Sequence, residues 1–250
     1  MSPASTARPH ALASYRTEFP IFEHQVYLNT CSLGALSVRS KRRVEAFLAT
    51  WEVRGAAAWY DVWWEALAEL RRRYGALIAA DPSAIALHAS VSTATAVLAS
   101  ALDHARRPKV VTTELDFPTV AYQWLAQRPL GVEVEIVPSP DGVTVPVDRI
   151  AEAVDQRTAL VATSHVYFTS GAVQDIRALA DVAHRAGAWC YVDAYQSVGQ
   201  LPLDVAGSGV DFLVAGGLKW LLGGPGIVFL YARPELIPDL RPTVTGWFAH

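Results

Sequence analysis

Lys219 is the residue of this sequence whose surroundings most favour chemistry. It lies among apolar residues and glycines in the segment 214–222, and it is one of only three lysines beside 18 arginines. An unpaired ammonium in an apolar setting is costly, so the pKa of this amine should fall or the amine should be modified. A lysine with a lowered pKa is a candidate nucleophile that forms a Schiff base with a carbonyl group. A lysine that extends from a loop to solvent would fit the local sequence equally well.

Asp193 and Gln196 form a second group of candidate residues. Asp193 ends the apolar run 189–192, and a buried strand there would place its carboxylate in the ligand crevice of a parallel sheet. A ligand with a protonated ring nitrogen would give this carboxylate a charged partner, and Gln196 could reach the same ligand. An aspartate that starts a turn or caps a helix is the alternative explanation.

The segment 90–95 and Phe117 complete the set. The hydroxyl-rich segment 90–95 follows a strand-like run and opens a helical one, so its N–H groups could hold an anion; an ordinary helix cap is the alternative. Phe117 follows another strand-like run and could stack on a flat ring or belong to the core. The four positions together offer an amine, a carboxylate, an anion cradle and an aromatic ring. Pyridoxal 5′-phosphate (PLP), a phosphorylated aromatic aldehyde with a ring nitrogen, needs this set.

The elements that must position these residues alternate between short β-rich runs and helices of roughly 10–15 residues. This alternation predicts an α/β fold with a mostly parallel, seven-stranded sheet covered by helices on both faces. The strands are expected at 85–87, 109–113, 132–137, 158–163, 189–192, 211–214 and 226–231, and the helices at 41–53, 60–74, 92–104, 118–126, 147–154 and 175–186.

Composition excludes several classes of protein. The chain has 250 residues, of which 52% are hydrophobic and 18% are charged, so disorder is not its main state. A net charge of −3 offers no basic excess for nucleic acid. The two cysteines have no metal-ligand spacing, and no apolar leader opens the chain, so a cytoplasmic protein is expected. The apolar segment 212–232 is as long as a membrane span, but its glycines and Lys219 indicate two buried strands around a loop, and no membrane association is expected.

Two further groups of side chains receive structural explanations. Lys41 and Lys109 fit solvated surface roles that arginine could fill equally well. Six large side chains recur at helical spacing between residues 60 and 74 and predict core or subunit packing rather than a ligand platform. They are Tyr60, Trp63, Trp64, Leu67, Leu70 and Tyr74.

Three segments, 192–199, 201–205 and 217–223, closely resemble class V of the PLP-dependent aminotransferase superfamily. This class includes cysteine desulfurases, kynureninases and isopenicillin-N-epimerase-like enzymes, and the resemblance extends from about Val26 to the last residue. It implies the large domain of fold type I of PLP-dependent transferases. The implied organisation is an N-terminal extension at 1–25, the PLP-binding large domain at 26–240, and at 241–250 the start of a crossover to a small C-terminal domain that is absent.

The resemblance also implies a role for each candidate residue. Lys219 would hold PLP as a Schiff base and carry the α-proton of the substrate, Asp193 would pair with the pyridinium, and Gln196 would lie near O3′ of the cofactor. The active site would lie at the interface of a homodimer. The other implied contacts are Ser92 and Thr93 with the phosphate, Phe117 stacked on the ring, and Trp247 with the phosphate of the partner subunit. Segment 165–171 departs from the desulfurase pattern; Thr169 could still reach the cofactor, and His165 could approach the substrate or be a core histidine.

The expected activity is that of a PLP-dependent enzyme acting on an amino-acid substrate. Segments 117–119 and 246–250 are similar to kynureninase sequences, whereas desulfurases usually stack a histidine on the ring, so a lyase or epimerase activity of kynureninase type is preferred over desulfuration. A PLP-binding or dimerising module without turnover is the alternative, because the missing domain normally carries the arginine that binds the substrate carboxylate. A nicotinamide-dependent reductase is disfavoured, since the glycine-rich phosphate fingerprint is absent.

Overall fold

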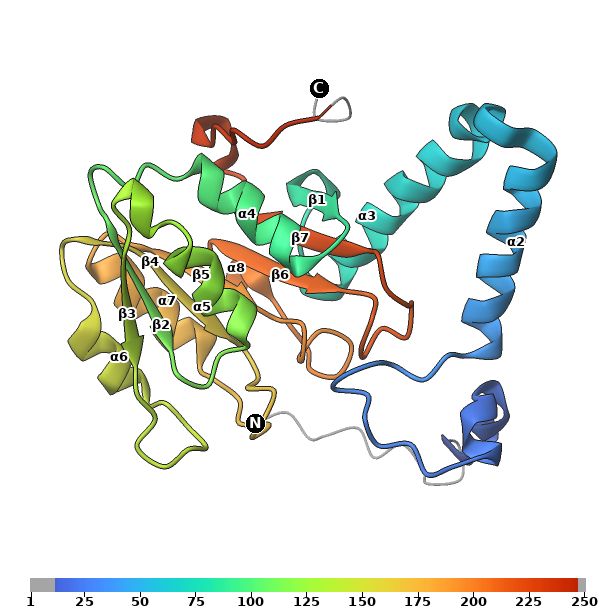
Figure 1. The fold of residues 1–250 in the computed structure, drawn as a ribbon, viewed down its shortest axis with the longest axis horizontal. Coiled ribbons are helices and arrows are strands. Elements are labelled where there is room, and N and C mark those ends of the chain that lie inside the picture. Colours follow the sequence, from blue (N-terminus) through green and yellow to red (C-terminus); the bar gives the residue numbers. More distant parts are fainter. Residues whose placement is uncertain (1–11, 247–250) are drawn as a thin grey trace.

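A mostly parallel sheet forms the centre of the molecule (Figure 1). The computed structural model describes residues 12–246, and these contain one seven-stranded sheet with the order β1-β7-β6-β5-β4-β2-β3. Only β7 runs antiparallel to its neighbours, so the predicted mostly parallel sheet is confirmed. The strands are β1 (Ile85–His88), β2 (Lys109–Thr113), β3 (Glu133–Val137), β4 (Thr158–Ser164), β5 (Trp189–Asp193), β6 (Phe212–Gly216) and β7 (Val228–Ala232).

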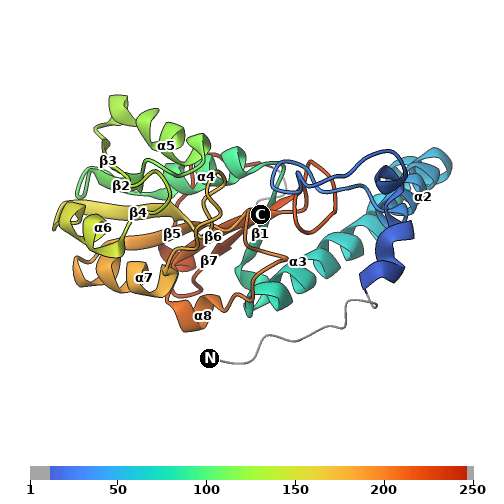
Figure 2. The same cartoon turned by 90° about the horizontal axis from the view of Figure 1, so that it is seen from below.

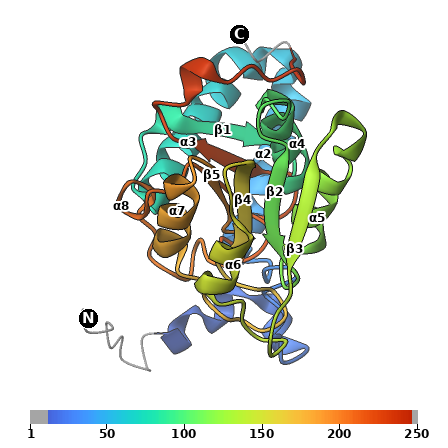
Figure 3. The ribbon, with the colours of Figure 1, turned by 90° about the vertical axis from the view of Figure 1, so that its left-hand side faces the viewer.

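Helices cover both faces of the sheet (Figures 2 and 3). Successive strand side chains point to opposite faces, so Val110 packs with Trp124 on one face while Val111 packs with Ile150 on the other. The first face carries α4 (Val91–Ala101) and α5 (Pro118–Leu125), and the second carries α3 (Trp64–Ile78), α6 (Val147–Ala153), α7 (Ile176–Arg185) and α8 (Val205–Ser208). Short 3-10 turns lie at Pro82–Ala84, Arg128–Leu130 and Ile237–Asp239.

Short helical turns precede the first long helix of the described chain. Two 3-10 turns, Ser14–Glu18 and Pro20–Glu23, fall in the predicted N-terminal extension. An extended stretch then leads to α2 (Val38–Arg54), whose first turn is capped by the Ser37 hydroxyl. The connection to α3 holds a 3-10 turn at Gly55–Ala57 and a π-helix at Trp59–Trp63. Together, α2 and α3 form a hairpin that extends away from the sheet (Figure 1).

The aromatic stripe predicted at residues 60–74 divides into two parts. Tyr74 is buried and its ring centroid lies 4.3 Å from that of Phe229, so this end packs in the core as expected. Tyr60 is 87% exposed and Trp64 is 42% exposed. This end therefore lies outside the core, because the start of α3 projects beyond the edge of the sheet (Figure 1). Subunit packing, the other half of the expectation, stays a prediction.

Lys109 is not the solvated lysine that its position in the sequence suggested. Its side chain is only 12% exposed, and its Nζ lies 2.7 Å from Glu135 Oε2 and 3.0 Å from Asp155 Oδ2. Lys109 begins β2, between β3 and β4, so carboxylates from both sides of the strand reach its amine. The interpretation of Lys41 as a surface residue is confirmed, since its side chain is 66% exposed.

The apolar segment 212–232 consists of β6, a loop and β7, as predicted. Across residues 12–246, no helix combines the length and the hydropathy that crossing a membrane requires. The loop between the two strands carries Lys219 and lies at the edge of the sheet where the parallel strands end. The loops after β1, β2, β4 and β5 reach the same edge, which is where ligands bind in open α/β sheets.

Candidate active site

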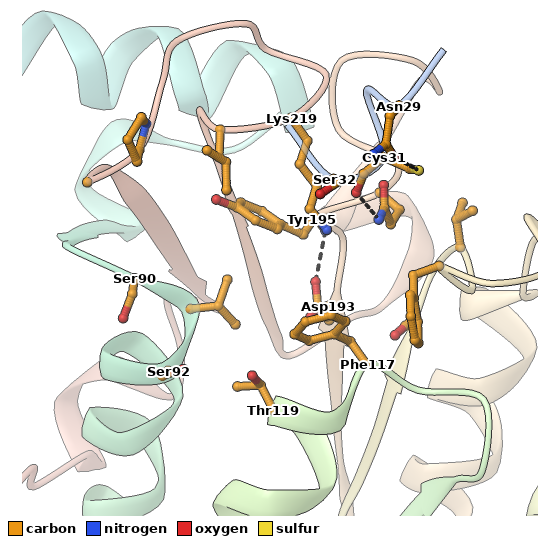
Figure 4. Close-up of a pocket in the computed structure, with 18 of the residues that line it drawn as sticks. Asn29, Cys31, Ser32, Ser90, Ser92, Phe117, Thr119, Asp193, Tyr195 and Lys219 are labelled. Carbon is orange, nitrogen blue, oxygen red and sulfur yellow. Dashed lines mark hydrogen bonds between the residues drawn. The ribbon is translucent and has the colours of Figure 1, made fainter. Parts of the chain in front are cut away.

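A cavity of about 690 Å³ opens at the carboxyl ends of the parallel strands (Figure 4). Side chains from the ends of β1, β2, β4, β5 and β6 and from the N-terminal segment enclose it. Five of the predicted site residues line it, namely Ser92, Phe117, Asp193, Gln196 and Lys219. These residues span 128 positions of sequence, from 92 to 219, so only the fold brings them together.

Lys219 is buried in the wall of this cavity. Lys219 lies in the loop after β6 and is 9% exposed. Its Nζ lies 4.9 Å from the centroid of the Tyr195 ring and 5.4 Å from the centroid of the Phe117 ring. Among residues 12–246, no carboxylate lies within ion-pair distance of this amine. Burial lowers the pKa of Lys219, while the charges of Asp193 and Cys31 oppose the shift. The neutral, nucleophilic amine is therefore easier to form here than in solvent.

Asp193 is the second buried ionisable group of the cavity. It is the last residue of β5, it is 6% exposed, and its Oδ1 accepts a hydrogen bond from the Tyr195 backbone N–H at 2.9 Å. Burial raises the pKa of Asp193 to about 6; Lys219 opposes this shift and Asp116 adds to it. A cationic group placed in the cavity would relieve the cost of burying this carboxylate.

Gln196 uses both ends of its amide within the protein. Its Nε2 donates to the Cys31 carbonyl at 2.7 Å, and its Oε1 accepts from the indole N–H of Trp220 at 2.9 Å. Gln196 also lines the cavity. Its hydrogen bonds show a further role, which is to hold the N-terminal segment against the loop that carries Lys219.

That N-terminal segment forms a wall of the cavity that sequence reasoning missed. Asn29, Cys31 and Ser32 all line the cavity. The wall approaches the Lys219 loop so closely that Gly34 N donates to Leu218 O at 2.8 Å, and a Cβ at Gly34 would lie 2.2 Å from Lys219 O. No spacing pattern in the sequence could have predicted this contact, because the two segments that form it are far apart in the sequence.

The segment after β1 caps α4 and faces the cavity. Ser90 Oγ accepts from Thr93 N at 3.1 Å, while Thr93 Oγ1 accepts from Ser90 N at 3.1 Å. This reciprocal capping box occupies the Thr93 side chain, which does not line the cavity. Ser90 and Ser92 do line it, so the hydroxyl of Ser92 and the N-terminus of α4 are the groups placed to meet an anion.

Phe117 lies at the start of α5 and contributes an aromatic face. Its ring meets Phe168 edge-on, with 5.1 Å between the centroids and 79° between the planes. Phe168 also lines the cavity, whereas the neighbouring Thr169 is exposed and does not. The sequence pointed to Thr169 and missed Phe168, along with Thr119, Ser164 and Tyr195 of the same lining.

The remaining predicted site residues are His165 and Trp247. His165 is 8% exposed but does not line the cavity, and its Nδ1 has no hydrogen-bond partner among the residues that the structure describes. Burial lowers the pKa of this imidazole. Trp247 lies outside the described residues. The roles expected for both residues stay predictions.

Comparison with known proteins places the chain in a family. The profile described as aminotransferase class-V matches residues 50–248. The chain belongs to the class-V aminotransferase family. This membership confirms the resemblance inferred from the sequence, and it agrees with pyridoxal 5′-phosphate as the expected cofactor.

Curated relatives carry several activities. A Bacillus subtilis protein described as the uncharacterized aminotransferase YcbU is 37% identical over 242 residues, which are 96% of this chain and 63% of that protein. The kynureninase of Pseudomonas fluorescens is 30% identical, with 96% of this chain and 59% of that one covered. A probable cysteine desulfurase of Methanothermobacter thermautotrophicus is also 30% identical, with 92% and 58% covered. The chain thus spans 58–63% of the length of these relatives.

Solved structures share the fold. A mutant of C-DES with glycine covalently linked to its PLP cofactor superposes with a TM-score of 0.86 at 24% identity, covering 93% of this chain and 63% of that one. The apo cysteine desulfurase of Thermococcus onnurineus NA1 gives a TM-score of 0.84 at 24% identity, with 98% and 62% covered. The expected fold type I architecture is thereby confirmed.

Proposed function

We propose that this chain binds pyridoxal 5′-phosphate through Lys219 and acts on an amino-acid substrate. The observation that carries the proposal is the burial of an amine and a carboxylate, Lys219 and Asp193, in one cavity at the ends of neighbouring strands. The cavity also holds an aromatic face at Phe117 and a capped helix N-terminus at Ser92. This donor set fits the aldehyde, ring nitrogen, ring face and phosphate of the cofactor.

The proposal gives each residue a defined task. When bound, the cofactor supplies an electron sink for charge that develops at Cα of the substrate. Lys219 Nζ holds the cofactor and moves the proton at Cα, which its lowered pKa favours. Asp193 holds the proton on the ring nitrogen, Phe117 orients the ring, and Ser92 meets the phosphate. The roles expected for Thr93, His165, Thr169 and Trp247 remain part of the proposal.

A lyase or epimerase activity of kynureninase type is the finer part of the proposal. An aromatic residue, Phe117, faces the cavity where desulfurases usually place a histidine, and Thr119 lines the cavity beside it. The kynureninase relative supports this choice at 30% identity, although a probable desulfurase matches equally well. A module that binds the cofactor without turnover is the alternative.

Two further expectations belong to the same proposal. A homodimer is supported by the apolar side chains exposed on α2, among them Phe47 and Trp51. A cytoplasmic location is supported by the two cysteines, Cys31 and Cys190, which are both free thiols.

Cofactor attachment is the first test. The purified chain, incubated with the cofactor, reduced with borohydride and digested, should carry the cofactor on the peptide that contains Lys219. The Lys219→Arg variant should carry none, because a guanidinium does not form the link, and Lys41→Arg on the exposed face of α2 is the matched control. Attachment to another lysine, or equal attachment to the Lys219→Arg variant, would refute the assignment.

Turnover is tested separately from attachment. In deuterated water, a chain that labilises the Cα proton exchanges it in its amino-acid substrate, whatever bond is later broken. We expect exchange with L-kynurenine or a related amino acid, and mass spectrometry of the products separates cleavage, epimerisation and desulfuration. A chain that holds the cofactor on Lys219 but exchanges no Cα proton in any amino acid is the module without turnover.

A further inference from the structure

Asp116 is a buried carboxylate with five hydrogen-bond donors. It is 6% exposed, and no cation lies within ion-pair distance of it among residues 12–246. Oδ2 accepts from Thr113 N at 2.8 Å, from Thr113 Oγ1 at 2.8 Å and from Thr112 Oγ1 at 3.0 Å. Oδ1 accepts from Ser164 N at 2.5 Å and from Thr163 Oγ1 at 3.1 Å. Oδ2 therefore accepts hydrogen bonds only from the end of β2, and Oδ1 accepts them only from the end of β4.

This carboxylate lies where the pairing of two strands stops. The register between β2 and β4 runs to Val111 and Val161 and no further. Beyond that point the Asp116 carboxylate joins the two strand ends in place of backbone hydrogen bonds. The pairing of β4 with β5, in contrast, continues to Ser164 and Asp193. Asp116 thus connects β2 to the strand pair that carries the buried carboxylate of the cavity.

Both ends of this connection face the cavity. Phe117, the residue that follows Asp116, presents its ring there, and Ser164, which donates to Asp116, lines the cavity as well. Within the turn between β2 and α5, Asp116 N donates to Thr113 O at 3.3 Å. Glu114 joins the turn to β3 and the loop after it, since its N–H donates to Val137 O at 3.0 Å and its Oε2 accepts from Ser139 N at 2.9 Å. The Asp116 carboxylate joins the turn to β4, on the side of Asp193, so the position of Phe117 relative to Asp193 depends on it.

We propose that Asp116 is a positioning residue for the cofactor site, which fixes Phe117 and Ser164 relative to Asp193 so that a flat ring fits between them. The proposal rests on the proposed function. Asp116 also places a second negative charge near Asp193, and this raises the pKa of Asp193 further. Loss of Asp116 would therefore change both the geometry and the electrostatics of the cavity.

The Asp116→Asn variant should break the link between the ends of β2 and β4. Threonine hydroxyls can rotate to accept a hydrogen bond from the new amide, but the backbone N–H groups of Thr113 and Ser164 can only donate. The single amide oxygen reaches one strand end, so one buried N–H loses its partner. Asp141→Asn is a matched control, because Asp141 also accepts from two backbone N–H groups, those of Val143 and Thr144, but in an exposed loop outside the cavity lining.

Amide hydrogen exchange tests the connection without any cofactor. In Asp116→Asn, we expect segments 112–119 and 162–166 to exchange at least about tenfold faster, since an unpaired buried N–H opens more readily. Segment 176–185 should keep the wild-type rate in the same sample. Asp141→Asn should leave the two cavity segments unchanged. Wild-type exchange of both segments in Asp116→Asn would overturn the proposal.

Cofactor affinity tests the consequence for the site. We expect Asp116→Asn to bind pyridoxal 5′-phosphate about tenfold more weakly and with an altered absorption band, and Asp141→Asn to bind it as the wild type does. If Asp116→Asn loses stability but keeps the wild-type affinity and band, Asp116 is only structural and the proposal fails. If the wild type binds no cofactor, the proposed function fails, while hydrogen exchange still decides whether Asp116 holds the cavity.

A milder variant covers the case in which Asp116→Asn does not fold. Thr163→Val removes one hydroxyl donor to Asp116 Oδ1 and leaves both backbone N–H groups paired. We expect a smaller, roughly threefold loss of affinity and faster exchange confined to the same two segments. Wild-type values for both measurements in Thr163→Val, with Asp116→Asn unfolded, would also overturn the proposal.

Discussion

Burial acts in opposite directions on the two ionisable groups of the cavity. It lowers the pKa of the Lys219 amine and raises that of the Asp193 carboxyl, so both are pushed towards their neutral forms. A neutral amine is the form that attacks an aldehyde, whereas the carboxyl is useful to a cationic ring nitrogen only when it is ionised. With a pKa of about 6, Asp193 is mostly ionised at neutral pH, so the two requirements are compatible.

The raised pKa of Asp193 predicts how the cofactor-free protein responds to pH. Between about pH 4 and pH 6 the folded state binds a proton that the unfolded state releases, so Asp193 lowers stability as pH rises, by up to about 3 kcal/mol. In urea unfolding, the stability of Asp193→Asn relative to wild type should therefore increase by this amount between about pH 4 and pH 7. The control is Asp141→Asn, because the pKa of Asp141 is lowered to about 2 and its titration lies below this range. Parallel curves for wild type and Asp193→Asn would contradict the prediction.

Single residues were predictable where one residue type is chemically necessary. Lys219 and Asp193 are charged residues that follow apolar runs in the sequence. Both are buried in the structure, so the apolar surroundings indicated by the sequence are also present in the fold. Thr93 and Gln196 were harder to interpret, because a hydroxyl or an amide serves equally well as a cap, a tie or a ligand contact. The structure shows that Thr93 caps α4 and that Gln196 joins two loops. Such partners depend on tertiary contacts that no local pattern contains.

At the scale of elements, the cavity depends on an N-terminal wall that is attached by few hydrogen bonds. Gln196 holds the wall at Cys31, Gly34 holds it at Leu218, and Ser40 Oγ donates to Leu222 O at 2.7 Å. Cys31 lines the cavity, so its thiol reports on how well the wall stays closed.

Loss of the Gln196 amide should loosen this wall. In Gln196→Leu, which keeps most of the volume but neither hydrogen bond, we expect the Cys31 thiol to react with a disulfide reagent roughly five to ten times faster. Cys190 is fully buried, with its pKa raised, and does not contribute to the signal. Gln156→Leu, at an exposed position, should react at the wild-type rate. A wild-type rate in Gln196→Leu would show that Gln196 does not secure the wall.

The strands and the helices that cover them could be predicted, because a fully covered parallel sheet imposes a clear rhythm of apolar runs and helices. The segment 109–113 was predicted with its observed bounds, and most other boundaries differ by a few residues. The N-terminal wall and the projecting hairpin could not be predicted in this way. The wall has no regular structure, and the hairpin leaves its apolar residues outside the core, so periodicity does not show what they contact.

For the molecule as a whole, the hairpin of α2 and α3 leaves an apolar stripe exposed. Val44, Phe47, Leu48 and Trp51 follow helical spacing on α2, and each is 46–58% exposed. Phe47 also packs against Trp63 across the hairpin, with 5.2 Å between ring centroids. Exposed stripes of this kind on α2 favour association with another surface.

The proposed homodimer makes this stripe testable. Sedimentation velocity should show the wild type as a dimer, and Phe47→Ser with Trp51→Ser should raise the dimer dissociation constant at least about tenfold, because each aromatic side chain buries a large apolar area. The control pair is Arg42→Ser with Arg43→Ser, at exposed charged positions on the same helix. A wild type that stays monomeric at micromolar concentration, or a double aromatic variant that dimerises normally, would contradict the prediction.

The hydrogen bond between Ser40 and Leu222 has a consequence for synthesis on the ribosome. Its two residues are 182 positions apart, so at about 5–20 residues per second roughly 10–40 s pass between the emergence of the first and the second. For most of this interval the N-terminal wall lacks its partners, because Gln196, Leu218 and Leu222 all emerge near its end, although α3 to α7 and the strands between them can already begin to assemble. The cavity is therefore completed late, when the loop that carries Lys219 reaches the N-terminal wall.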